Sequence, residues 1–308
     1  MNRPPKPDPG PTPPDVAAIV RRARRLRFRF DPGALAALSG AYLGARPGTG
    51  LTFSELRGYE PGDDVRHLDW NVTARQGKPY VRIYVEERAL TLRLIVDVSA
   101  SMRFGPDAAS KADRAMQAAA LLATAAIRNG DRAGLTLVSD QVELDLPPSG
   151  GARQLARLTR ALVASPSSSK RTDLASGLTT LAGSARRALV VVLGDFLEPG
   201  PEAPWRRAAR RHRVVAFRLV DPRERALPDA GLIATADAET GRRRVIDSGS
   251  RRVRSAFAAA AIEREAGFRR WLGATGIVGA DIPTDDDPVA PLVRFFRGRP
   301  AHRRRIKL

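Results

Sequence analysis

Apolar runs of strand length alternate with longer segments of helical character through most of the chain. Residues 90–98, 133–139, 188–194 and 214–220 are nearly continuous apolar runs, which is typical of strands buried on both faces. The Ala-rich segment 110–129 between the first two runs predicts a helix, with an N-terminal capping box and a C-terminal Gly. Strands that alternate with helices predict an α/β fold, in which a doubly wound, mostly parallel sheet is covered by helices on both faces.

The remaining predicted elements complete this sheet and add to it. They are a strand at 142–146 paired with its predecessor, helices at 151–164, 173–186, 203–211, 250–275 and 288–297, a hairpin of 231–236 with 243–246, and a last strand at 277–282. Upstream, glycines divide residues 42–87 into short runs that predict short strands, one of them at 80–85.

The same pattern predicts the domain organisation. We expect a disordered Pro-rich tail at 1–14, an N-terminal segment with short strands forming a small β-rich lobe at 15–88, an α/β domain at 89–285 with a hairpin excursion at 221–250, and a C-terminal helix with a basic tail at 286–308. The tail is too poor in apolar residues to pack.

Charge is concentrated at the two ends of the chain. The formal net charge is +19, and residues 1–50 and 297–308 each contribute +6. Basic ends suggest nucleic acid, anionic lipid or an acidic protein as partner, but the interpretation that we favour is a solvated surface in an Arg-rich protein. Aromatic residues do not interleave with these basic residues as they do in a base-stacking surface.

Composition and motifs exclude several functional classes. The chain has no Cys and three His, which excludes disulfides and thiolate sites and makes a His-rich zinc site improbable. No run reaches 18 apolar residues and the N-terminus lacks the apolar core of a signal peptide, so we expect a cytoplasmic protein without a membrane span. The motifs of a phosphate-binding P-loop and of a nucleophilic serine elbow are also missing.

Oxygen-bearing side chains follow the predicted strands at one edge of the sheet. Asp97, Ser99 and Ser101 end the first strand, Thr172 precedes a helix, and Asp195 ends a later strand. In open α/β sheets, ligands bind beyond the carboxyl ends of the strands. Two carboxylates with three hydroxyls predict a site for Mg²⁺ or Mn²⁺, with the alternative that they only cap helices and end strands.

This pattern resembles the metal-ion-dependent adhesion site of von Willebrand factor A-like domains. A longer stretch, FSELRGYEPGDDVRHLDWNVTAR at 53–75, is similar to the signature of the domain of unknown function 58 family, and later motifs at 86–88, 102–105, 221–225 and 237–241 resemble that family too. The resemblance covers residues 20–300. It implies a von Willebrand A-like sheet with an additional N-terminal segment. Gly194 departs from the family, which commonly has Ser before the last metal-binding Asp.

The 53–75 signature has two interpretations. Its residues are Glu55, Arg57, Tyr59, Gly62, Asp63, Asp64, Arg66, Asp69, Trp70 and Arg75. Among them, Asp63, Asp64 and Asp69 are either a carboxylate cluster with His67 as general base or, as we favour, the acids of a tight turn at Pro61-Gly62, where they cap backbone N–H groups and pair with Arg. We expect Trp70 to pack in the core of the lobe.

The resemblance implies a non-enzymatic, metal-dependent protein-binding module, in which an Asp or Glu of the partner completes the metal site. Genes of this family often accompany MoxR-type AAA+ ATPases, which makes such an ATPase the expected partner in assembly or maturation of a client. The alternative is a nucleic-acid-associated protein that uses its basic ends. A metal-assisted hydrolase would need a base near Asp97, and the sequence displays none.

Overall fold

A computed structural model describes residues 51–86, 90–105, 110–164, 171–182, 187–236 and 242–297. They fall into two compact units, a small unit described over 51–86 and a large unit described over the other ranges. Both the predicted Pro-rich tail and the basic segment after residue 297 lie outside the described residues. None of the described helices combines the length and apolar character that a membrane crossing requires.

The large unit is built on a six-stranded sheet in the order β10-β7-β6-β3-β4-β5. Its strands are β3 (Thr91–Asp97), β4 (Arg132–Val138), β5 (Val142–Ser149), β6 (Leu189–Gly194), β7 (Arg213–Val220) and β10 (Val278–Pro283). All neighbours pair in parallel except β5, which returns antiparallel along β4. The predicted doubly wound, mostly parallel α/β fold is therefore confirmed.

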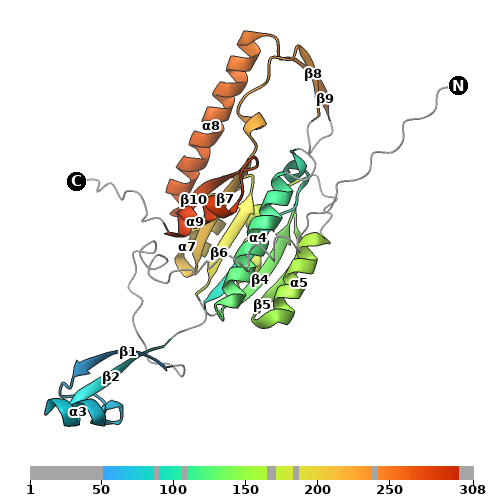
Figure 1. Cartoon of the computed structure of the whole chain (residues 1–308). Helices are drawn as coiled ribbons and strands as arrows, with labels where there is room; N and C mark the ends of the chain where they lie inside the picture. The colour runs from blue at the N-terminus through green and yellow to red at the C-terminus, as the bar shows by residue number, and fades with distance from the viewer. Residues whose placement is uncertain are drawn as a thin grey trace. The chain divides into compact units, whose positions relative to one another are not determined.

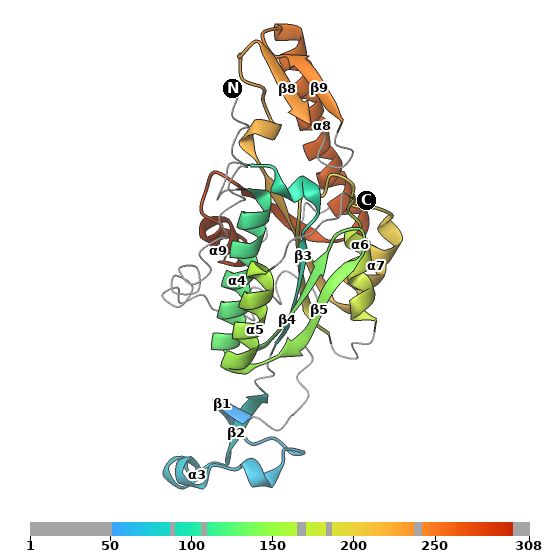
Figure 2. The ribbon, with the colours of Figure 1, turned by 90° about the vertical axis from the view of Figure 1, so that its right-hand side faces the viewer.

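Helices cover both faces of this sheet (Figure 2). They are α4 (Lys111–Arg128), α5 (Gly151–Val163), α6 (Leu174–Gly177), α7 (Glu202–Arg211), α8 (Arg251–Thr275) and α9 (Val289–Arg297). On one face α4 packs with α5 and α9, and on the other lie α6, α7 and the C-terminal part of α8. The start of α4 has the predicted capping box, because Ser110 and Asp113 each bond the backbone N–H of the other.

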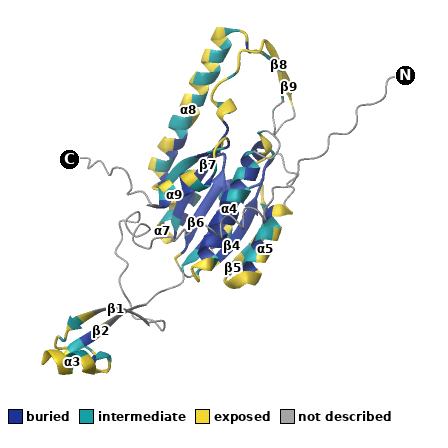
Figure 3. Ribbon diagram, viewed as in Figure 1, coloured by how far each residue is buried: buried dark blue, intermediate teal, exposed yellow. Residues whose placement is uncertain are grey.

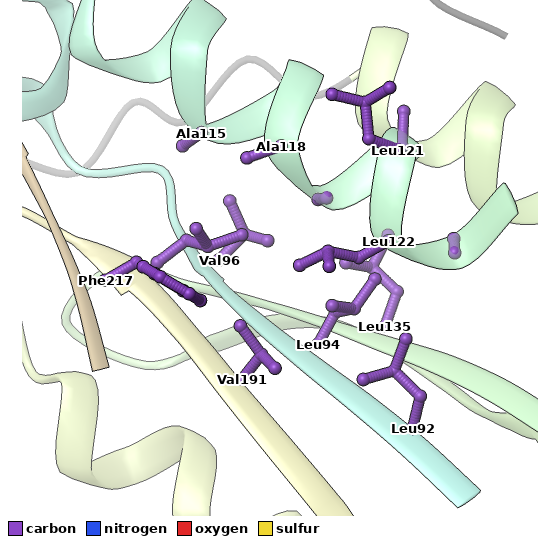
Figure 4. Packing of buried hydrophobic residues seen from close by; sticks show 14 of the residues in the cluster. Leu92, Leu94, Val96, Ala115, Ala118, Leu121, Leu122, Leu135, Val191 and Phe217 are labelled. Atoms are coloured by element: carbon purple, nitrogen blue, oxygen red, sulfur yellow. The ribbon is translucent and has the colours of Figure 1, made fainter. Parts of the chain in front are cut away.

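Strand β3 contributes to the core on both faces of the sheet. Leu92, Leu94 and Val96 face α4 (Figure 4), whereas Ile95 points into the layer of α6 and α7. All four are fully buried, and burial of each such side chain stabilises the folded state by about 1.5–3 kcal/mol. The alternation follows from the two-residue repeat of a strand. Because β3 has a neighbouring strand on each side and a core layer on each face, its C-terminal end lies in the middle of one end of the sheet.

The C-terminal ends of three parallel strands lie side by side at that edge. In the register of the sheet, Val96 pairs with Leu193 of β6, and Gly194 pairs with Arg218 of β7. Residues that follow β3, β6 and β7 are consequently neighbours in space although they are far apart in the sequence.

A hairpin and a long helix extend from the end of β7. The hairpin pairs β8 (Leu232–Ala236) with β9 (Arg243–Asp247) in a sheet of its own, and α8 then returns toward the main sheet (Figure 1). Buried residues of α8 occur only from Phe268 onward, and the earlier turns are partly or fully exposed (Figure 3). The first turns of α8 are joined to the hairpin segment by Arg254, which pairs with Asp229.

The small unit consists of two antiparallel strands and one short helix. Its elements are β1 (Leu51–Gly58), a 3₁₀ turn (Val65–His67), α3 (Trp70–Gln76) and β2 (Tyr80–Glu86). Gly77 ends α3 in a left-handed conformation (φ 67°), as a C-terminal cap commonly does.

The prediction of one continuous helix over 173–186 is wrong for the described part of this range. The structure has only α6, followed by a 3₁₀ turn at Leu178–Leu181, and residues 183–186 lie outside the described residues. The hydroxyls of Ser176, Thr179 and Thr180 each donate to a backbone carbonyl three residues earlier. Such bonds compete with the helical ladder.

Candidate metal centre

Three of the predicted ligands lie at the end of β3. Asp97 is fully buried and accepts a hydrogen bond from the backbone N–H of Ser99 through its Oδ1 atom, at 2.9 Å. The hydroxyls of Ser99 and Ser101 are 3.2 Å apart, and both residues are buried. A 3₁₀ turn at Ala100–Arg103 follows β3 and brings the second hydroxyl beside the first.

Asp195 follows β6 and lies next to Asp97 across the sheet. Gly194, the last residue of β6, allows the two strand ends to come close together. A Cβ atom at this position would lie 3.2 Å from Asp97 Oδ2 and 3.1 Å from Leu174. The side chain of a Ser here would therefore crowd Asp97, so the departure from the family pattern makes room for the first carboxylate.

The chain turns sharply after Asp195. Phe196 has a φ of 50°, the only positive value among the described residues other than glycine. This conformation costs about 1–3 kcal/mol for a bulky residue. It is held by an aromatic cluster, because the centroid of the Phe196 ring lies 5.3 Å from that of Phe268 and 5.5 Å from that of Trp271. Packing in this layer thus fixes the direction in which Asp195 leaves its strand.

Thr172 lies at the same end of the sheet, because a backbone hydrogen bond of its neighbour Asp173 holds this segment there. Asp173 donates its N–H to the carbonyl of Ser139, directly after β4, and Val98 donates to the carbonyl of Val138. The Thr172 hydroxyl is buried without a hydrogen-bond partner among the described residues. The structure accordingly places all five predicted ligands around one edge of the sheet.

Sequence reasoning missed a buried lysine in this centre. Lys111, the first residue of α4, is fully buried, and its ammonium group donates to Asp195 Oδ2 at 3.1 Å and to Glu224 Oε1 at 2.8 Å. Glu224 also closes a capping box with Asp221 in the turn that follows β7. A family motif at 221–225 had marked this turn, but nothing in the sequence paired it with Lys111.

The charges of this cluster act on each other strongly because water is excluded. Burial raises the pKa of the Asp97 carboxyl to about 7, and the negative charge of Asp195 acts in the same direction. Burial lowers the pKa of the Lys111 ammonium, but the charges of Asp195 and Glu224 outweigh it and leave that pKa above its ordinary value. Lys111 therefore stays charged, whereas Asp97 takes up a proton more readily than an ordinary Asp does.

The oxygen atoms of this centre fit a hard divalent cation. Asp97 Oδ2 and Thr172 Oγ1 are buried atoms without a hydrogen-bond partner among the described residues, and such atoms are rare in folded proteins unless a ligand or water satisfies them. In the described ranges there is no group of three or more His, Cys, Asp or Glu side chains that could hold a metal ion. A site here would consist of two carboxylates and three hydroxyls, which suits Mg²⁺.

The 53–75 signature lies in the small unit, and its acids serve the local fold. Asp63 pairs with Arg57 at 2.8 Å, Asp64 pairs with Arg66, and Asp69 pairs with Arg82 at 2.9 Å. Asp63 accepts from the backbone N–H of Glu60, and the other two acids cap the 3₁₀ turn and α3. The hydrogen bond from Arg82 also holds the pKa of Asp69 below its usual value. These contacts agree with the turn interpretation.

Other signature residues occupy the strands and turns of the same unit. Glu55 lies in β1, Tyr59 donates its backbone N–H to Pro79, Gly62 has a φ of 110°, and Arg75 is exposed in the last turn of α3. The prediction that Trp70 packs in the core is wrong, because its side chain is 70% exposed. It occupies the first position of α3, where its neighbour Asp69 is the buried residue that caps the helix.

The fold defines the class of this protein. A mostly parallel sheet covered by helices on both faces has the architecture of a von Willebrand factor A-like domain. Residues 55–267 match the family described as protein of unknown function DUF58, and the chain belongs to that family.

Relatives of the chain are found in mycobacteria. An uncharacterized protein of Mycobacterium tuberculosis is 36% identical over 268 residues, covering 85% of this chain and 84% of the relative. Among solved structures, an aerotolerance-related membrane protein of Bacteroides fragilis is similar over 68% of this chain and 100% of its own, with 14% identity and a TM-score of 0.42. The von Willebrand A domain of SpRpn10 is similar over 67% and 95%, with 11% identity and a TM-score of 0.34.

The first prediction concerns the metal-free stability of the Asp97 site. Because the native pKa of about 7 lies above the ordinary value of 3.8, the native state binds more protons between these values, and stability falls as pH rises through them. Asp97→Asn removes this dependence. In EDTA, the free energy of unfolding of Asp97→Asn minus that of the wild type should increase from pH 4 to pH 7 and then stay constant.

Urea unfolding followed by tryptophan fluorescence measures this advantage. Trp205 and Trp271 are buried in the large unit, so a Trp70→Phe background reports on that unit alone. Asp285→Asn, an exposed position, is the control and should leave the pH dependence unchanged. Parallel pH profiles for wild type and Asp97→Asn would contradict the prediction.

The second prediction concerns Lys111. Replacing it with Met leaves Asp195 and Glu224 without their shared counter-charge, and breaking a buried ion pair costs about 3–5 kcal/mol. Adding Asp195→Asn to Lys111→Met removes one of the unpaired charges. The double variant should therefore lose less free energy of unfolding than the two single variants lose in sum. The same unfolding assay in EDTA completes this double-mutant cycle. Additive effects would show that the two side chains do not interact.

Proposed function

We propose that this protein is a non-enzymatic, divalent-metal-dependent protein-binding module that works with a MoxR-type AAA+ ATPase. The observation that carries the proposal is the set of buried oxygen atoms at the end of the sheet, two of which lack hydrogen-bond partners among the described residues. The matching family is one of unknown function, and the chemistry at this end of the sheet supports the proposal.

The charges at this edge support a divalent cation. Asp97, Asp195 and Glu224 contribute three negative charges when ionised, and Lys111 contributes one positive charge through contacts with two of them. The cluster is therefore short of two positive charges. An ion of charge +2 held by Asp97 and Asp195 would make it neutral, while Glu224 would balance Lys111.

Asp97, Ser99, Ser101, Thr172 and Asp195 are the residues that would hold the ion, some of them through water. Mg²⁺ or Mn²⁺ supplies a coordination position that a carboxylate can occupy in place of water. The chain itself orients the oxygen ligands, excludes water from Asp97 and keeps Asp195 in place through Lys111. A carboxylate of the partner would complete such a site.

A binding role is favoured over a hydrolytic one by the positions of the histidines. His212 accepts a hydrogen bond from the N–H of Ala188, before β6 begins and thus at the opposite edge of the sheet. A metal-assisted hydrolase needs a base positioned near the ion, and within the described part of the large unit no histidine lies at the end of the sheet that carries Asp97.

The expected partner follows from the resemblance and from the absence of a nucleotide motif in the sequence. The chain contains no P-loop sequence, so an energy-driven cycle requires a second protein. An AAA+ ATPase of the MoxR type supplies that energy in this proposal. A surface Asp or Glu of the ATPase would reach the metal edge.

The third prediction is direct binding of a divalent cation. Calorimetry should detect one Mg²⁺ or Mn²⁺ site in the wild type and none of comparable affinity in Asp97→Ala, because one of the two ion-neutralising carboxylates is gone. Asp285→Ala, which removes an exposed carboxylate elsewhere, should bind like the wild type. Equal affinity in wild type and Asp97→Ala would rule out this site.

The fourth prediction is metal-dependent association with the ATPase. A pull-down with the MoxR-type ATPase of the same organism should succeed in Mg²⁺, fail in EDTA, and recover when excess Mg²⁺ is restored. Asp97→Ala and Asp195→Ala should abolish it, whereas deletion of residues 1–14 should have little effect, since that tail carries only two basic side chains. Undiminished binding in EDTA would exclude the metal from the interaction.

A further inference from the structure

A pocket of about 300 Å³ opens beside the candidate metal centre. It lies between the ends of β6 and β7 and one side of α8. Asp195 belongs to its wall, so the pocket and the candidate metal centre share a residue. The walls of the pocket consist of protein side chains alone.

One side of the pocket is apolar. Phe196 and Phe268 are buried and belong to the aromatic cluster that fixes the turn after Asp195. Leu197 is 50% exposed, and Ala261 leaves room on the side of α8. A half-exposed Leu next to buried rings is a surface that an apolar side chain can cover with a gain in free energy.

The other side of the pocket carries guanidinium groups. Arg218 is buried, lies 4.7 Å from the Phe268 ring, and binds both oxygens of Asp281. Arg225 is exposed and reaches that same carboxylate only at 3.6 Å. Arg264 is exposed, donates to the backbone oxygen of Glu224, and makes no ion pair with a described residue.

The acids in the wall leave these guanidinium groups available. Lys111 contacts both Asp195 and Glu224 and offsets one of their two negative charges, whereas Glu265 pairs with Arg269 and Asp281 with Arg218. Arg225 and Arg264 outnumber the one acid charge that remains, so the mouth of the pocket carries a net positive charge. Arg is the side chain best suited to hold a carboxylate through two hydrogen bonds.

We propose that this pocket binds an acidic peptide segment of the protein partner. One apolar side chain of the segment packs against Leu197 and Phe268, and a carboxylate close to it in the sequence is held by Arg225 and Arg264. This inference rests on the proposed function for its partner, because Asp195 belongs both to the candidate metal centre and to the wall of the pocket, so one partner segment can reach both. It adds the sequence preference that the metal alone does not provide.

Random peptides displayed on phage, selected on the immobilised full chain in Mg²⁺, test the proposal without knowledge of the partner. We expect enrichment of peptides that carry Asp or Glu within a few residues of Leu, Ile, Met or Phe. A synthetic copy of an enriched peptide then gives an affinity by fluorescence anisotropy. Failure to enrich such sequences would overturn the proposal.

Two independent variants locate the peptide. Arg225→Gln with Arg264→Gln removes the positive mouth, and Ala261→Phe fills the apolar side without changing charge. Each should weaken the peptide at least about tenfold. Matched controls on exposed positions of α8 are Arg252→Gln and Ala260→Phe, which should bind like the wild type. Unfolding curves confirm that each variant is folded, and unchanged affinity in both pocket variants would overturn the proposal.

EDTA and Asp97→Ala separate this inference from the proposed function. Loss of binding in EDTA together with loss in the pocket variants supports both. Binding that survives EDTA but is lost in the pocket variants supports the pocket and contradicts the metal mechanism. Binding that is lost in EDTA and unaffected by the pocket variants supports the metal and overturns the pocket.

Discussion

The rest of this site depends on one constraint, which is the burial of two neighbouring carboxylates at the C-terminal end of the sheet. Asp97 and Asp195 are at most 4% exposed, and charges are costly in such surroundings unless they are paired. In this structure Lys111, the first residue of α4, supplies a positive charge to Asp195 and also contacts Glu224 in the turn after β7. Three elements of the sheet edge are thus joined by one ammonium group, and the start of α4, the end of β6 and the end of β7 are held in a single arrangement.

The second constraint is the left-handed conformation of Phe196. A bulky residue keeps such a conformation only where its surroundings over-determine it, and here the rings of Phe268 and Trp271 from α8 do so. The same packing places Leu197 beside the aromatic cluster and forms the apolar side of the pocket. The direction of Asp195 and the shape of the neighbouring pocket therefore have one cause. The long helix α8 matters to the site through the few buried residues near its C-terminal end, although most of it is exposed.

Local signals in the sequence were sufficient to predict the sheet and to place the five candidate residues at one end of it. Continuous apolar runs identified β3 and β6, and the capping box at Ser110 identified the start of α4. Lys111 could not be found in this way, because a lysine in the first turn of a helix is normally exposed. Its burial depends on Asp195 and Glu224, which are 84 and 113 residues away in the sequence. Trp70 was misplaced for the related reason that an aromatic residue does not reveal which side of a short helix faces the core.

The lysine also changes how the candidate metal centre is understood. An ammonium group in contact with a metal ligand usually argues against a cation, because like charges repel. Here Lys111 has a second carboxylate, Glu224, whose contact at 2.8 Å is shorter than the 3.1 Å contact to Asp195. Glu224 can balance the lysine while Asp97 and Asp195 balance a divalent ion, so the two cations need not compete for the same charge. Without an ion, Lys111 keeps Asp195 in position and the raised pKa lets Asp97 become neutral. In the proposed site an ion would bind the ionised form of Asp97, so that ion binding and loss of the Asp97 proton would be coupled.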